Sequence, residues 1–261
     1  MTRLGSYNLV RMIGEGGFGR TYEGRHYLNP KLRACLKQGI NISSADEKIL
    51  ITEANVLAEI HHHSLPAFRD LYKADDGSLV LAMSYIDAKD LEHSVKKHKA
   101  IHPEDVCWIA QRSLNALYYL HSHGIIHGDI KPPNIMIKAK ERNVFLVDFG
   151  LSSIRPTAST KPVGYTEIFA APEVYKGLPP IPQSDLYSLG VTMIYALGGN
   201  PVSKTMPKYV PQPIQKFCQD LTRSDAMQRP SWGSEDLVSR LSDVRMESFG
   251  RRHVGLPKTK M

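Results

Sequence analysis

The first third of the chain alternates short apolar runs with turns. Four segments have the β-branched and aromatic content that is typical of strands: 7–13, 20–25, 34–38 and 79–83. The glycine-rich run 14–19 and the sequence Asp75-Asp76-Gly77 predict turns between them. This part of the chain is therefore expected to be rich in β-sheet.

One helix is expected among these strands. Ser44 opens the pattern Ser44-Ala45-Asp46-Glu47, a capping box in which the serine side chain caps the amide three residues on. Apolar residues then recur at helical spacing, namely Ile49, Val56, Leu57 and Ile60. Glu53 falls on the same stripe, and a carboxylate on the inward face of a helix needs a partner. Glu53 is therefore the first candidate functional residue in the sequence.

The pattern changes to helices after Met83. Two helices and two short strands are expected: 103–124, 184–197, 135–138 and 144–147. Pro103 suits a first helical turn and Gly124 a helix end, while Ser184 is expected to cap the second helix. That helix is apolar nearly all round and should lie in the core. The expected fold class is α+β, with a sheet-rich lobe (about 1–83), a boundary at 84–90 and a larger helical lobe (about 91–241).

A glycine motif between the first two strands is open to two interpretations. Gly14-Glu15-Gly16-Gly17-Phe18-Gly19 matches G-x-G-x-x-G, which occurs in dinucleotide-binding folds and in loops that cover the phosphates of ATP. The dinucleotide interpretation requires a helix after the glycines, whereas residues 20–25 have β character. A strand, a glycine loop and a second strand favour the phosphate-covering loop.

Further motifs follow at the spacing that such a loop predicts. They are Ala34-Cys35-Leu36-Lys37, His127-Gly128-Asp129-Ile130-Lys131-Pro132-Pro133-Asn134, Asp148-Phe149-Gly150, Ala171-Pro172-Glu173, the segment 184–190 with Asp185, and Arg229. In this order they resemble the protein kinase domain over about 7–241. The string G-G-F-G-R-T-Y resembles the eukaryotic-like serine/threonine kinases of bacteria. The resemblance implies a bilobal fold and transfer of the γ-phosphoryl group of ATP to a serine or threonine of a protein.

The resemblance also implies roles for individual residues. It assigns catalytic work to Lys37, Glu53, Asp129, Lys131 and Thr166. Lys37 would hold the α- and β-phosphates with Glu53 as its ion-pair partner, and Asp129 would orient the attacking hydroxyl. Asn134 and Asp148 would bind Mg²⁺, or Mn²⁺ in its place. Glu173 is expected to pair with Arg229.

Nucleotide binding is assigned to a larger set by the same resemblance. Its members are Gly14, Gly16, Gly17, Phe18, Gly19, Thr21, Cys35, Lys37, Met83, Ser84, Tyr85, Asp90 and Met136. The glycines would bring backbone amides to the phosphates, and Thr21, Cys35 and Met136 would sandwich the adenine between the lobes. Met83 is expected as the gatekeeper, 84–86 as the hinge backbone and Asp90 as a ribose contact.

Two departures from the family pattern affect regulation and substrate binding. Gly128 stands where most members have an arginine, whose guanidinium pairs with a phosphate on the loop 151–164. Phosphorylation of that loop is therefore not expected to be required. Four prolines, Pro201, Pro207, Pro211 and Pro213, exclude a long helix after Gly198 and predict a shortened substrate-docking region.

Two other functions remain open. His127-Gly128-Asp129 with Asn134 also resembles the catalytic loop of aminoglycoside and choline kinases, which phosphorylate small molecules. A catalytically silent nucleotide-binding module is the other alternative, although silent members usually lose the lysine, the base or the metal-binding aspartate, all of which are present here.

Composition limits the remaining possibilities. The chain has 261 residues and a net charge of +7, and the segment 245–261 carries five basic residues against one acidic one. We interpret that segment as a flexible, solvated tail rather than a nucleic-acid contact. Three cysteines without metal-ligand spacing, no secretory leader and no apolar run of membrane-spanning length favour the cytoplasm. No second domain is visible, so regulation by a separate partner or by expression is expected.

Overall fold

The computed structural model of the chain describes residues 2–16, 19–39, 43–252 and 258–259. The chain divides into two units, Met1–Asp87 and Ala88–Met261, which we call the N-terminal unit and the C-terminal unit. Each unit has its own hydrogen-bonded sheets and buried apolar residues, and each is described by itself below.

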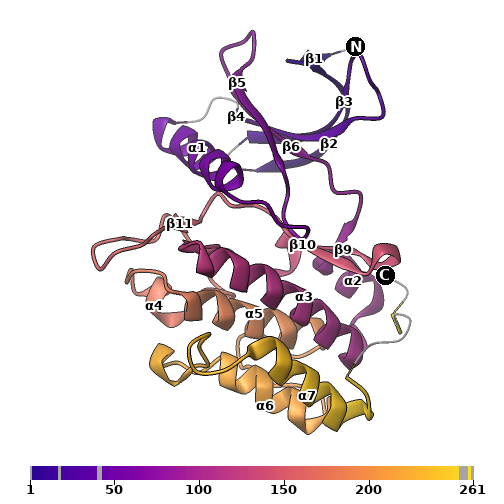
Figure 1. Cartoon of the computed structure of the whole chain (residues 1–261), viewed down its shortest axis with the longest axis vertical. Helices are drawn as coiled ribbons and strands as arrows, with labels where there is room; N and C mark the ends of the chain where they lie inside the picture. The colour runs from indigo at the N-terminus through magenta and orange to yellow at the C-terminus, as the bar shows by residue number, and fades with distance from the viewer. Residues whose placement is uncertain (1, 17–18, 40–42, 253–257, 260–261) are drawn as a thin grey trace. The chain divides into compact units, whose positions relative to one another are not determined.

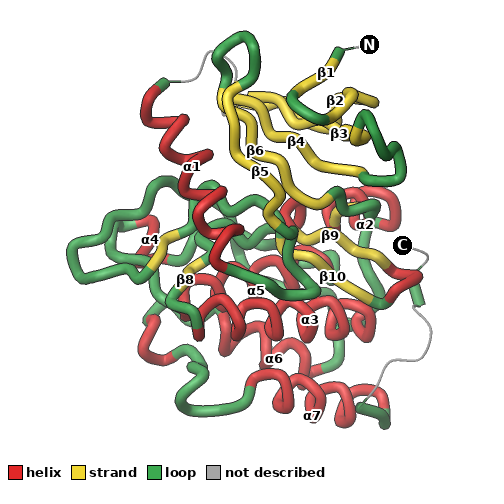
Figure 2. The backbone as a smooth tube through the Cα atoms, turned by 45° about the horizontal axis from the view of Figure 1, so that its top comes forward, coloured by secondary structure: helices red, strands yellow, loops and turns green. Residues whose placement is uncertain are grey.

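The N-terminal unit is built on a curled antiparallel sheet of six strands, with α1 (Ser44–Glu59) beside it (Figures 1 and 2). The spatial order is β1-β2-β3-β4-β6-β5. The strands are β1 (Arg3–Leu4), β2 (Tyr7–Gly16), β3 (Gly19–His26), β4 (Arg33–Gly39), β5 (Phe68–Lys73) and β6 (Leu79–Ser84). The four predicted strands are confirmed. Strand β5 was not predicted, because its side chains are mostly exposed and show no apolar alternation.

The two faces of this sheet differ in chemistry because side chains alternate along each strand. One face carries an apolar cluster of buried residues: Leu4, Tyr7, Ala34, Leu36, Val80 and Ala82. The residues between them on β4 and β6, including Cys35, Lys37 and Met83, point to the opposite face.

The N-cap of helix α1 lies one residue earlier than predicted. Ser43, rather than Ser44, is the N-cap, and its side chain accepts a hydrogen bond from the Asp46 backbone N–H. The Asp46 carboxylate accepts from the Ser43 backbone N–H in return. Adjacent serines make the sequence pattern ambiguous by one position, and only the aspartate at the third helical position completes the box.

The C-terminal unit is mainly helical (Figure 2). Its helices are α2 (Leu91–His98), α3 (Pro103–Ser122), α4 (Pro172–Tyr175), α5 (Pro182–Ala196), α6 (Gln212–Leu221) and α7 (Leu237–Phe249). Its strands are β7 (Lys89–Asp90), β8 (Ile125–Ile126), β9 (Ile135–Lys138), β10 (Asn143–Leu146) and β11 (Ser153–Ile154), with short 3₁₀ turns at Pro132–Asn134, Ala139–Glu141 and Ala226–Gln228. Helix α5 is almost entirely buried and packs against α3 and α6, while α7 packs against α3 and α6. The predicted central helix is confirmed.

The start of α5 corrects one sequence expectation. The helix begins at Pro182, so Ser184 lies inside the first turn rather than at the cap. The Ser184 hydroxyl accepts from the Ile181 backbone N–H and donates to Glu173. Between α5 and α6 the chain runs through turns until Gln212, in agreement with the proline pattern.

The described part of the basic tail differs from the expectation of a free segment. Arg251 donates two hydrogen bonds to the carboxylate of Glu104, at 2.7 and 2.6 Å. The Asp105 carboxylate accepts from the backbone N–H groups of Lys258 and Thr259. Glu104 and Asp105 are 1% and 0% exposed, so the tail satisfies two buried carboxylates at the start of α3. Among the residues that the structure describes, no helix has both the length and the apolar character to cross a bilayer.

Candidate active site

In the N-terminal unit, four of the predicted nucleotide contacts share one face of the sheet. Thr21 on β3 pairs in register with Lys37 on β4, and Cys35 pairs with Met83 on β6. Directly paired residues project to the same side, as do residues two apart on one strand. These four side chains therefore lie on the face opposite the apolar cluster. Met83 is buried, whereas Thr21 and Cys35 are half-buried.

Lys37 and Glu53 form an ion pair on this face. The Lys37 Nζ atom donates to Glu53 Oε2 at 2.7 Å. The Glu53 side chain is 1% exposed and that of Lys37 is 16% exposed, so a cation at the edge of solvent is held by a buried anion. The partner that the inward carboxylate required is therefore Lys37.

The glycine motif starts on β2 at Gly14 and ends on β3 at Gly19. Gly14 and Gly16 are on β2, where Gly14 pairs with Thr21 and Gly16 with Gly19. Gly19 has φ +117°, and a Cβ atom there would lie 2.0 Å from the Gln38 carbonyl oxygen, so only glycine fits. Gly17 and Phe18 lie outside the described residues.

The C-terminal unit gathers four polar side chains on the loop after β8 and the segment before α4. Thr166 Oγ1 donates to Asp129 Oδ1 at 2.7 Å, and Lys131 Nζ donates to Thr166 Oγ1 at 2.9 Å. Lys131 Nζ also lies 2.8 Å from Asp129 Oδ2. Asn134 Nδ2 donates to the backbone carbonyl of Asp129 at 2.9 Å and to its Oδ2 at 3.0 Å. The Asp129 carboxylate is thus fixed from three sides and is 7% exposed.

Asn134 and Asp148 are the predicted metal ligands. With its Nδ2 amide donating to Asp129, the Oδ1 atom of Asn134 is directed away from that carboxylate. Asp148 follows β10 and has φ +67°, a left-handed conformation that is uncommon for aspartate. Among the described residues no cluster of three or more His, Cys, Asp or Glu side chains could hold a metal ion.

A buried hydrogen-bond network holds the backbone of the loop that follows β8. Asp185 Oδ2 accepts from the His127 backbone N–H at 2.8 Å, and its Oδ1 accepts from the Gly128 backbone N–H at 2.9 Å. His121 Nε2 lies 2.8 Å from Asp185 Oδ2, and the indole N–H of Trp232 donates to His121 Nδ1 at 2.7 Å. Because an indole N–H can only donate, His121 Nε2 carries the proton that it gives to Asp185.

Electrostatics keep Asp185 ionised in this network. Burial alone would raise the pKa of Asp185, but the hydrogen bonds from the His121 ring and the Gly128 backbone N–H outweigh it and lower that pKa below its ordinary value. Burial lowers the pKa of His127, whose ring is tilted by 48° to that of Phe149 with the ring centroids 4.8 Å apart. Sequence reasoning missed His121 and Trp232, since the two residues are 111 positions apart and no spacing links them.

Gly128 has a structural reason to be glycine. Its φ is +78°, and a Cβ atom there would lie 2.5 Å from the Leu151 carbonyl oxygen. The loop after Asp148-Phe149-Gly150 therefore passes so close to Gly128 that no side chain fits in this arrangement. An arginine at this position is incompatible with the observed path of the loop.

The remaining predicted nucleotide residues have identifiable local partners. Ser84 Oγ accepts from the Ala67 backbone N–H, and Tyr85 OH accepts from Arg11. Asp90 caps α2 by accepting from the His93 backbone N–H at 2.6 Å, and it pairs in register with Met136. Asp90 and Met136 thus lie side by side in the C-terminal unit, while Ser84 and Tyr85 belong to the N-terminal unit.

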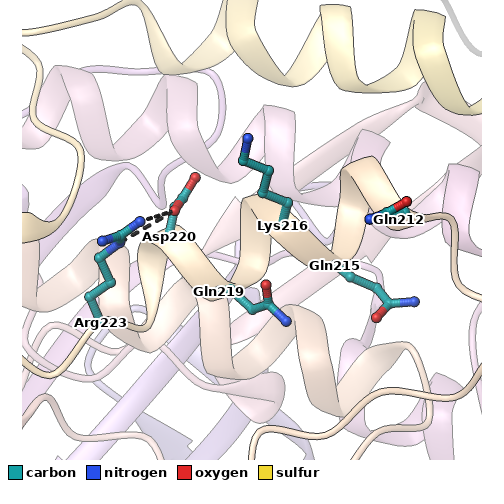
Figure 3. A pocket seen from close by; sticks show the side chains of 6 residues that line it. All are labelled: Gln212, Gln215, Lys216, Gln219, Asp220 and Arg223. Carbon is teal, nitrogen blue, oxygen red and sulfur yellow. Dashed lines mark hydrogen bonds and ion pairs between the residues drawn. The ribbon is translucent and has the colours of Figure 1, made fainter.

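A polar surface pocket lies elsewhere, at α6 of the C-terminal unit. Figure 3 shows six polar side chains of α6 and its end, lining a pocket of about 530 Å³: Gln212, Gln215, Lys216, Gln219, Asp220 and Arg223. Two of these residues, Asp220 and Arg223, form an ion pair at 2.8 Å. No predicted site residue is among them.

Comparison with known proteins identifies the family. The protein kinase domain family matches residues 7–243, so the chain belongs to the protein kinase family. The chain is 32% identical over 219 residues to serine/threonine-protein kinase F of Synechocystis sp., covering 75% of this chain and 44% of that protein. It is 29% identical over 206 residues to serine/threonine-protein kinase pkn3 of Myxococcus xanthus, covering 74% and 38%. A third relative, serine/threonine-protein kinase 36 of Pongo abelii, is 30% identical over 247 residues, covering 87% and 18%.

The names of these relatives indicate the type of kinase, and their lengths can be compared with that of this chain. They are serine/threonine kinases, two of them bacterial, which confirms the resemblance to eukaryotic-like serine/threonine kinases of bacteria. The chain spans less than half the length of each of these curated relatives.

Proposed function

We propose that this chain transfers the γ-phosphoryl group of Mg-ATP to the hydroxyl group of a serine or threonine in a protein substrate. The observation that carries this proposal is the arrangement of Asp129, Lys131 and Thr166. A carboxylate lies 2.8 Å from a lysine ammonium, and one threonine hydroxyl bridges the two groups. Such a pair supplies a proton acceptor and a cation at one place, as phosphoryl transfer requires.

Each of these groups has a distinct task in the reaction. The Asp129 carboxylate orients the acceptor hydroxyl and takes its proton as the new oxygen–phosphorus bond forms and the bond to the ADP oxygen breaks. Lys131 neutralises the negative charge on the transferred phosphoryl oxygens. Thr166 is a positioning residue, because its hydroxyl fixes both the carboxylate and the ammonium.

The sheet face of the N-terminal unit serves nucleotide binding. Lys37 contacts the α- and β-phosphates, and its ion pair with buried Glu53 fixes the direction of the ammonium. Backbone amides of the glycine motif cover the phosphates. Residues Thr21, Cys35, Met83 and Met136 contact the adenine, the backbone at Ser84 and Tyr85 bonds its edge, and Asp90 contacts the ribose.

The chemistry of Asn134 and Asp148 fits Mg²⁺. Both offer hard oxygen atoms, and Mg²⁺ is commonly bound by one or two protein groups together with substrate phosphates and water. When bound, the ion would supply charge neutralisation of the phosphates, and Mn²⁺ has similar ligand preferences. In this arrangement Asn134 has a second task, since its amide also holds the Asp129 carboxylate.

The setting of the activity is also a proposal. We place it in the cytoplasm, under control of a separate protein partner. The three cysteines favour a reducing compartment, and Cys107 and Cys218 are buried thiols whose pKa values are raised by burial.

The acceptor class can be tested directly. Purified chain is incubated with Mg²⁺ and γ-labelled ATP, in parallel with generic protein substrates, choline and an aminoglycoside. Label on serine or threonine of the protein substrate is the expected result, by phosphoamino-acid analysis. Label on choline or the aminoglycoside would indicate a small-molecule kinase, and nucleotide binding without transfer would indicate a silent module.

A further inference from the structure

A buried carboxylate on β3 is held between two arginines from the neighbouring strands. Glu23 is 3% exposed. Its Oε2 atom accepts from Arg11 Nε at 3.0 Å, and its Oε1 atom accepts from Arg33 Nε at 3.1 Å, with Arg33 Nη2 at 2.9 Å. Burial alone would raise the pKa of Glu23, but the hydrogen bonds from Arg11 and Arg33 lower it below its ordinary value. Glu23 is therefore a fixed anion at neutral pH.

Both arginines also contact the segment that follows β6. Arg33 Nη1 donates to Asp87 Oδ2 at 2.8 Å, and the Arg33 guanidinium lies over the ring of Tyr85 at 4.2 Å from its centroid. Arg11 Nη2 donates to the Tyr85 hydroxyl at 2.8 Å. Tyr85 thus has one arginine on its ring face and another on its hydroxyl, and all five residues belong to the N-terminal unit.

Glu23, the anchor to which both arginines bond, lies on the sheet face that carries the predicted nucleotide contacts. Glu23 pairs in register with Cys35, and it is two residues from Thr21 on β3. Arg33 is likewise two residues from Cys35 on β4. By strand alternation, Thr21, Glu23, Arg33 and Cys35 share one face. The network therefore directly adjoins the positions assigned to the adenine.

We propose that Arg11, Glu23, Arg33, Tyr85 and Asp87 form a hinge clamp, in which the two arginines position the 84–87 backbone for nucleotide binding. The inference rests on the proposed function, because the backbone at these positions is assigned to the adenine edge. Arg33 is the main positioning residue, since it joins the anchor Glu23 to both Tyr85 and Asp87. Its guanidinium can stack and form a fork of hydrogen bonds at once, which an ammonium cannot.

The test compares nucleotide affinity in variants that differ only at the clamp. Arg33→Gln is expected to raise the Kd and KM for Mg-ATP about threefold to tenfold, the range for partly exposed ion-pair and cation–π contacts, with kcat at saturating ATP unchanged within about twofold. Arg33→Lys should recover part of the affinity because it keeps the charge. Arg25→Gln is the matched control, since Arg25 is an exposed arginine paired in register with Arg33 but is absent from the clamp.

Binding is measured by titration calorimetry, kcat and KM by transfer of label, and folding by thermal unfolding. Should Arg33→Gln fail to fold, Tyr85→Phe removes only the hydroxyl that accepts from Arg11 and should still raise the Kd. An Arg33→Gln Kd equal to that of the wild type, or equal rises in Arg33→Gln and Arg25→Gln, would overturn the hinge clamp alone. A wild-type chain that binds no Mg-ATP would overturn the proposed function as well.

Discussion

Replacing Glu173 with alanine should destabilise the C-terminal unit strongly. Glu173 accepts two hydrogen bonds from Arg229, Nη1 to Oε1 at 2.7 Å and Nη2 to Oε2 at 2.9 Å, as the sequence motifs predicted. The Arg229 side chain is 0% exposed. Its other three N–H groups donate to backbone carbonyls, those of Gln183, Arg223 and Ser224. Without Glu173 the buried guanidinium keeps neutral partners and loses its counter-charge.

The magnitude follows from that burial. Removing one partner of a buried, hydrogen-bonded ion pair costs about 3–5 kcal/mol, whereas an exposed pair is worth less than about 1 kcal/mol. A domain is stable by about 5–15 kcal/mol in total, so Glu173→Ala should remove a large share. In a chain of this size the melting temperature should fall by about 10 °C. Glu167→Ala, at an exposed glutamate on the same segment, is the control and should change little.

The pH dependence of the unfolding free energy tests the same ion pair in a second way. Burial alone would raise the pKa of Glu173, but hydrogen bonds from Arg229 and Ser184 lower it below its ordinary value of 4.5. A carboxyl group whose pKa is lowered in the folded state stabilises that state above pH 4.5. This stabilisation is lost as the pH falls through the folded-state pKa. The difference in unfolding free energy between the wild type and Glu173→Gln should therefore narrow below pH 4.5.

The assay is chemical and thermal unfolding of wild type, Glu173→Ala, Glu167→Ala and the double variant Glu173→Ala/Arg229→Met. The double variant should be less destabilised than the sum of its single variants, because it leaves no unpaired buried charge. A loss in Glu173→Ala of less than about 1 kcal/mol, no larger than for an exposed pair, would refute this reasoning.

Three further predictions concern the site, the tail and the loop. Lys37→Met should lose most transfer activity while keeping the fold, and Glu53→Gln should lose less, since it only misplaces the lysine; full activity in Lys37→Met would remove its assigned role. Deleting 250–261 should leave the Kd for Mg-ATP unchanged but lower the melting temperature, because buried Glu104 and Asp105 lose their partners; an unchanged melting temperature would contradict the tail contacts. Replacing Thr157, Ser159 and Thr160 with alanine should keep transfer activity within about twofold of the wild type, because Gly128 supplies no cation for a loop phosphate; a tenfold loss with normal ATP binding would contradict this.

The structure reduces the set of loop residues that could be phosphorylated. Ser152 and Ser153 are 2% and 8% exposed, so they are not accessible to a kinase in this arrangement. The Ser152 hydroxyl donates to the His127 carbonyl at 3.0 Å. Thr157 and Ser159 are exposed, and Thr160 is half-buried and accepts from the Thr157 backbone N–H. Phosphorylation would thus be confined to the tip of the loop.

Motif chemistry predicted the contacts that lie within the family's conserved pattern. The inward position of Glu53 predicted its ion pair with Lys37, and motif spacing predicted Thr166 beside Asp129 and Lys131. These contacts could be expected because periodicity places a residue on a face and a motif assigns its partner.

Long-range contacts specific to this chain could not be predicted in that way. Arg251 and Glu104 are 147 positions apart, and a basic residue in a Gly- and Pro-interrupted segment is ordinarily solvated. Arg11, Glu23 and Arg33 look like surface charges of exposed strands until the register places them together. Their partners are set by tertiary packing, which leaves no local signal.

The most direct test of the proposed function is phosphoryl transfer by Asp129→Asn. This substitution keeps the size of the side chain and an oxygen that can accept from Thr166 Oγ1, but it removes the proton acceptor. Label transfer from γ-labelled ATP to a protein serine or threonine should fall by at least about a hundredfold, while the Kd for Mg-ATP and the melting temperature stay near wild type. Transfer by Asp129→Asn at the wild-type rate would contradict the assignment of Asp129 and, with it, the proposed site.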